Sequence, residues 1–172
     1  MSERVIKCNL SQKSIGNVIK ELKAYQNSLR DKNEVFLKRL CELGIPVIDE
    51  NIMLAQGDSD RNHNTYIKIN RFGNYAQATL VCEGSGILFI EFGAGIHYNT
   101  PAGTSPHPKG EEFGYTIGSY GQGKGKNESW VYVANSGEWV RSYGTKATMP
   151  VYKASVEIMQ NIRKIAKEVF ST

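Results

Sequence analysis

Apolar side chains recur at three- and four-residue spacing along the first third of the chain, with Lys, Glu and Arg between them. Such spacing places the apolar positions on one side of a helix. Residues 11–43 are therefore predicted to form one long amphipathic helix or two in succession. Gly44 and Pro46 are typical of a helix end, and residues 47–54 are expected to add a short helical turn. The apolar positions of the first segment are Ile15, Val18, Ile19, Leu22, Leu29, Val35, Phe36, Leu40 and Leu43.

The end of the chain has the same periodicity. Pro150 is suited to the first turn of a helix, because its missing N–H has no partner there in any case. A helix is therefore predicted over residues 149–170. Its apolar stripe consists of Val151, Ala154, Ile158, Ile162, Ile165 and Val169.

Between these helices the apolar period changes to two. Ile67 and Ile69 alternate with polar neighbours, which is the pattern of a half-buried strand. Short turns separate that run from two more apolar runs, at residues 76–82 and 87–92. Residues 65–92 are therefore expected to form an antiparallel meander of three strands.

A further strand region is predicted over residues 129–140. The order of elements then predicts an α+β fold in one domain, residues 1–172. An antiparallel sheet of about four strands would be packed by the two helices. A sheet this small does not always cover two amphipathic helices, so a neighbouring subunit is expected to help.

A glycine-rich segment, residues 93–127, interrupts the regular pattern and holds nine of the 17 glycines. Connections longer than about 15 residues are usually functional or disordered. This one also contains aromatic residues, which need a surface to pack on, so we expect the loop to order against something. Its aromatic residues are Tyr98, Phe113, Tyr115 and Tyr120.

Composition narrows the class of protein. The chain is 40% hydrophobic and 22% charged, and no apolar run approaches the roughly 18 residues of a membrane span. The N-terminus does not resemble a secretory signal. Cys8, Cys41 and Cys82 form no metal-binding or disulfide pattern and fit a reducing cytoplasm. The net charge of +4 permits contact with DNA but does not indicate a sequence reader.

One short motif suggests a nucleotide site. In "GSYGQGKGK", residues 118–126, Gly123 and Lys124 follow a glycine at phosphate-loop spacing, but Gly125 stands where a Ser or Thr should bind magnesium. The next segment is predicted to be a strand and not the helix that such a loop requires. We expect no nucleotide site, and a nucleotide- or DNA-binding enzyme that uses this loop remains the alternative function.

Other candidate chemistry is sparse. A metal site could draw on His97, His107, Glu91, Glu111 and Glu112, but their spacing matches no ligand motif. No metal, cofactor or catalytic residue is therefore predicted.

The basic residues of the loop, Lys109, Lys124 and Lys126, favour a solubilising loop tip over a direct DNA contact, because neighbouring glutamates offset their charge. Trp130 and Trp139 are either exposed anchors for a partner or core residues.

Four segments resemble the neck and tail-completion proteins encoded in phage and prophage morphogenesis clusters of Gram-positive hosts. They are "IEFGAGIHYN" (90–99), the loop "HPKGEEFGYTIGSYGQGKGK" (107–126), "WVYV" (130–133) and "GTKATMPVYKASVEIMQNIRKIAKEVF" (144–170). The helical segment at residues 18–45 also fits their opening helix, so the resemblance covers about residues 15–170.

The resemblance implies a structural, non-enzymatic virion protein that is assembled in the host cytoplasm. Copies would form a homo-oligomeric ring between the head-closure or connector proteins and the tail-terminator or tube proteins, with DNA passing through it without sequence reading. Residues 118–126 would then be an adaptable assembly loop. A small host-interaction protein of phage origin is a third possibility. The residues expected to serve the assembly loop are Lys109, Phe113, Tyr115, Tyr120, Lys124 and Lys126.

Overall fold

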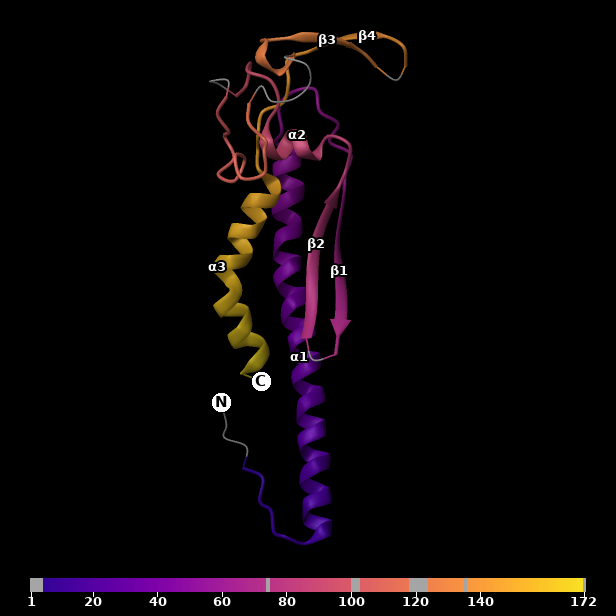
Figure 1. Ribbon diagram of the computed structural model, residues 1–172, viewed down its shortest axis with the longest axis vertical. Helices are drawn as coiled ribbons and strands as arrows, with labels where there is room; N and C mark the ends of the chain where they lie inside the picture. Colours follow the sequence, from indigo (N-terminus) through magenta and orange to yellow (C-terminus); the bar gives the residue numbers. More distant parts are fainter. Residues whose placement is uncertain (1–4, 74, 100–102, 118–123, 135, 172) are drawn as a thin grey trace.

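The computed structural model describes residues 5–73, 75–99, 103–117, 124–134 and 136–171. It confirms an α+β fold with long helices near both ends and antiparallel strands between them (Figure 1). The elements in chain order are α1 (Gln12–Met53), β1 (Asn64–Phe72), β2 (Tyr75–Glu83), α2 (Ile87–Phe92), the 3-10 turn η1 (Lys124–Lys126), β3 (Trp130–Val133), β4 (Trp139–Ser142) and α3 (Pro150–Phe170).

α1 is the central element, and α3, β1 and β2 all pack against it. α3 runs antiparallel along one side of its C-terminal half, and the β1–β2 hairpin lies along another side (Figure 1). One apolar cluster, which includes Ile48, Ile90 and Ala154, joins α1, α2 and α3. A second joins Leu40 to the end of α3, where the rings of Phe36 and Phe170 lie 5.7 Å apart.

The predicted end of the first helix at residue 43 is wrong, because α1 continues through Gly44 and Pro46 to Met53. A Cβ atom on Gly44 would lie 2.5 Å from Leu80 Cδ2 of β2 and 3.1 Å from Ile158 Cδ1 of α3. This glycine therefore permits close packing and does not end the helix. Pro46 removes one N–H from the helix, and the helix continues through it with Gly44 and Ile48 buried on either side.

The strands form two separate hairpins instead of one sheet. β1 and β2 pair from Asn64 opposite Glu83 to Phe72 opposite Tyr75, and β3 and β4 form a four-pair ladder. The predicted third strand of the meander is wrong, because its residues form α2. Ile87 and Ile90 are buried three residues apart, a helical spacing that a short apolar run does not reveal by itself.

Although α1 is 42 residues long, neither it nor any other helix in the described part of the chain has an apolar stretch that could cross a membrane. The N-terminal half of α1 extends beyond the ends of both α3 and the β1–β2 hairpin (Figure 1). Its first turn begins at Ser11, whose hydroxyl accepts a hydrogen bond from the Ser14 N–H.

We predict opposite effects for the same substitution at two glycines of α1. Gly44→Leu should lower the free energy of unfolding by about 1–3 kcal/mol, because the added side chain overpacks the contact with β2 and α3. Gly16→Leu should raise it by up to about 1 kcal/mol through helix propensity, since no atom lies within 4 Å of a Cβ there. Denaturant unfolding measures both. An equal effect at the two sites would contradict the packing role of Gly44.

Candidate assembly surfaces

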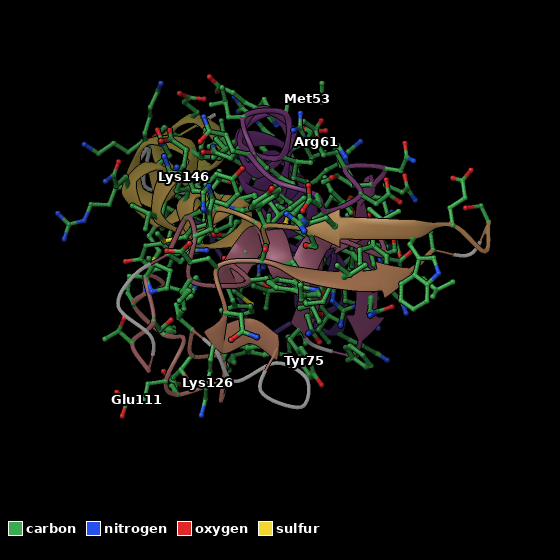
Figure 2. The ribbon with its side chains drawn as sticks, turned by 90° about the horizontal axis from the view of Figure 1, so that it is seen from above. Met53, Arg61, Tyr75, Glu111, Lys126 and Lys146 are labelled. Carbon is green, nitrogen blue, oxygen red and sulfur yellow. The ribbon has the colours of Figure 1, made fainter. Side chains whose placement is uncertain are left out.

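Two residues predicted for the assembly loop, Phe113 and Tyr115, lie against Phe92 of α2. α2 lies at the end of the molecule where α1 ends and α3 begins (Figure 1). Tyr120 falls outside the described residues, and so does the side chain of Lys124. Lys126 and Glu111 both point outward on the loop side (Figure 2). The exposed charge of the loop is therefore mixed in sign, as the sequence predicted.

A buried carboxylate links this loop to α3. Glu91, in α2, is 5% exposed, and its two oxygens accept the Val151 and Tyr152 N–H groups at 2.7 and 2.9 Å. These are free donors of the first turn of α3, where a negative charge is also favoured by the helix dipole. Glu91 therefore caps α3 from another element.

His107 completes this cluster. Its Nε2 lies 2.9 Å from Glu91 Oε1, and its Nδ1 accepts the Lys109 N–H at 3.0 Å. The ring nitrogen that faces Glu91 is therefore the one that donates. The loop is thereby fixed to the start of α3 through two buried polar side chains.

The metal site considered from the sequence does not form around this pair. Glu111 and Glu112 are exposed, and His97 packs instead against the rings of Tyr98 and Tyr143. Within the described residues no three His, Cys, Asp or Glu side chains come together in a way that could hold a metal ion. The sequence offered Glu91 and His107 only as conceivable metal ligands, and the structure instead joins them by a hydrogen bond that fixes the loop.

The loop rings pack around Phe92, which follows Glu91 at the end of α2. Tyr115 stacks on it with centroids 4.3 Å apart and an interplanar angle of 11°, and Phe113 meets it edge-on at 6.3 Å. These two residues order against a surface, as expected. Phe113 stays more than half exposed, so part of this cluster still faces outward.

The described part of the phosphate-loop motif does not resemble a nucleotide site. Lys124–Lys126 forms a 3-10 turn, and the next element is β3, the strand that the sequence predicted here. No helix N-terminus follows directly to face a phosphate, which a phosphate loop requires.

The β3–β4 hairpin projects sideways from the body (Figure 1). Its two tryptophans, which the sequence left as anchors or core residues, differ in environment. Trp130 is half-buried against Gly95, where a Cβ would lie 2.8 Å from the indole ring. Trp139, at the far end of the hairpin, is 76% exposed. Val131, Tyr132 and Val133 are exposed beside it.

A cleft of about 420 Å³ opens at the base of this hairpin. Its walls include Phe89, Trp130 and Tyr132, together with the carboxylates of Asp58 and Asp60. Asp58 accepts the Tyr143 N–H at 2.7 Å. The Asn62 N–H, and then the Ser85 hydroxyl, lower the pKa of Asp60. Both carboxylates therefore hold local structure, and sequence analysis missed the cleft because its walls come from segments far apart in the chain.

The N-terminal half of α1 is a second uncovered surface. Ile15, Ile19, Leu22 and Tyr25 are all at least 40% exposed. The sequence anticipated that a small sheet leaves helix surface uncovered, and the structure places that surface before residue 34 of α1.

We predict that Glu91→Gln destabilises the protein by about 1–3 kcal/mol. The amide keeps one acceptor but turns its NH₂ group toward a backbone N–H, which leaves a buried donor of α3 unsatisfied. Denaturant unfolding measures the effect. The control is Glu111→Gln, an exposed carboxylate on the same loop that should change little. Equal stability of the two variants would show that Glu91 does not cap α3.

Comparison of the chain with models of protein families, with curated proteins and with solved structures finds no match. The family resemblance of the sequence therefore stays a prediction.

Proposed function

We propose that this chain is a structural, non-enzymatic subunit of a phage neck or tail top, where copies form a ring that joins the head connector to the tail. The observation that carries the proposal is the projecting β3–β4 hairpin with Trp139 exposed at its end. A two-stranded hairpin is marginally stable alone in water. Its exposed indole and valine side chains would be buried by a neighbouring subunit.

The position of the hairpin suits a head-to-tail contact. It extends away from the long axis of the body, so it would reach a neighbour on one side only (Figure 1). Contacts of this kind use different surfaces on the two partners, and they close into a ring when the rotation between copies allows it. The loop beside the hairpin, fixed through His107 and Glu91, would present Phe113 and Lys126 to the same or an adjoining partner.

The charge of the protein is compatible with DNA passing through such a ring. A net charge of +4 gives weak, sequence-independent attraction to phosphates. Direct base readout would need side chains placed in a groove, and the sequence contains no motif for that purpose. Passage of DNA needs only a lumen that neither holds it tightly nor repels it.

The decisive experiment removes the protein from the phage or prophage that encodes it. Induced cells should then accumulate filled heads and separate tails, and added purified protein should restore joined particles in electron micrographs. Joined, infectious particles in the absence of the protein would overturn the proposed role. Unjoined heads and tails that the protein cannot rescue would also count against it.

We predict that Trp139→Ser abolishes this rescue without changing the fold. The indole makes no contribution to the apolar clusters of the body, so the midpoint of thermal unfolding should stay the same. Glu138→Ser, at the neighbouring exposed position of the same turn, is the matched control and should rescue as the unmodified protein does. Full rescue by the Trp139 variant would exclude the hairpin as the contact.

A further inference from the structure

The uncovered surface of α1 continues an interface that the chain already uses. Ile15, Leu22, Leu29, Phe36 and Leu43 follow one another at intervals of seven residues, so they lie along one side of the helix. Phe36 and Leu43 pack in the apolar cluster with α3. The first three residues therefore face the same way as the α3 contact. Ile15 and Leu22 are exposed, and Leu29 is partly buried.

The two elements that cover α1, which are α3 and the β1–β2 hairpin, both end near residues 34–36 of α1. α3 ends at Phe170, whose ring lies against Phe36. The β1–β2 hairpin ends at Phe72 and Tyr75, next to the ion pair between Arg71 and Glu34. The 24 residues of α1 before Phe36, residues 12–35, would span about 36 Å at 1.5 Å per residue.

The described residues before the cap of α1, residues 5–10, do not cover the stripe. In residues 5–10, Val5 is 71% and Leu10 is 97% exposed. Helices in proteins obtain most of their stability from packing of an apolar face. A bare stripe of this length is therefore expected to have a partner.

We propose that the partner is the same segment of a second copy, packed antiparallel as a two-helix coiled coil in the free protein. The inference rests on α1 alone, and it does not depend on the proposed place of the protein in a virion.

The antiparallel direction of the second helix follows from the positions of α3 and β2 on α1. α3 and β2 pack on the buried side of α1 that continues this stripe. A parallel partner would bring its own α3 and hairpin to the same side at the same level, where the two bodies would collide. An antiparallel partner places each body beyond the free end of the other helix, so both stripes are covered in full.

The register follows from the centre of the bare segment, between Lys23 and Ala24. A two-fold axis perpendicular to the helices at this point pairs Leu22 with Tyr25 of the second copy, and Val18 with Leu29 of the second copy. Val18 and Tyr25 follow Ile15 and Leu22 by three residues, so each pair joins a residue of the seven-residue series to one of this second position, as knobs-into-holes packing requires. The shape of the bare segment and its sequence thus select the same register.

The first test is the mass of the purified full-length protein by light scattering across a concentration series. We expect twice the 19.2 kDa of one chain at high concentration, with dissociation on dilution. Leu22→Glu should give a single-chain mass at every concentration, with the helical circular dichroism of the unmodified protein in its diluted, single-chain form. Asn27→Glu is the control, because that side chain is exposed and points away from the stripe, so its mass should match the unmodified protein. A single-chain mass for the unmodified protein at every concentration overturns the proposal.

A cross-link tests direction and register, and it decides the case if larger species form. We would mix Val18→Cys protein with Leu29→Cys protein, both carrying Cys8→Ser because Cys8 is exposed. Burial raises the pKa of the Cys41 and Cys82 thiols, so these should oxidise slowly. The mixture should form a covalent dimer on mild oxidation, and neither variant should do so alone. A dimer from Val18→Cys alone would show a parallel pair, and no cross-link in the mixture would show a different contact; either result overturns the proposal.

Discussion

The packing of α3 and β2 against one side of α1 is the contact on which the rest of the structure depends. It requires a close approach at Gly44, where any side chain would meet Leu80 and Ile158. Two apolar clusters form along this contact, and the first of them holds α2 against α1 and α3. The same contact covers only the C-terminal half of the helix, so apolar side chains of the N-terminal half stay exposed in the single chain.

The glycine-rich loop depends on a different kind of interaction. Glu91 brings a buried negative charge to the first turn of α3, and His107 uses the same carboxylate to hold the loop. A buried carboxylate is stable only when its oxygens are hydrogen-bonded, and here the start of a helix and a loop side chain provide the donors. The rings of Phe113 and Tyr115 in the loop pack against Phe92, the residue after Glu91. The described part of the loop is therefore anchored at Glu91 and Phe92 of α2.

Much of the fold could be predicted from the sequence, because the periodicity of long amphipathic segments is a strong signal. The errors came from residues whose local preference is overridden by packing. Gly44 and Pro46 suggest a helix end unless the close approach of β2 and α3 is known. Ile87–Phe92 is too short for its period to distinguish a strand from a helix. The candidate surfaces divide in the same way: an uncovered helix face could be anticipated, whereas the contrast between Trp130 and Trp139 depends on tertiary placement.

The two proposed contacts differ in symmetry. A pair of α1 helices is closed after two copies, whereas the hairpin contact can continue into a ring. A single ring at the tail would therefore require the helices to separate on docking, and pairing would shield the stripe until then.

Hydrogen exchange of the free protein tests the claim that α1 is covered along its whole length most directly. The account predicts that amides of residues 15–29 are protected at high concentration and lose that protection on dilution, while residues 36–48 stay protected throughout. Rapid exchange of residues 15–29 at every concentration would contradict it.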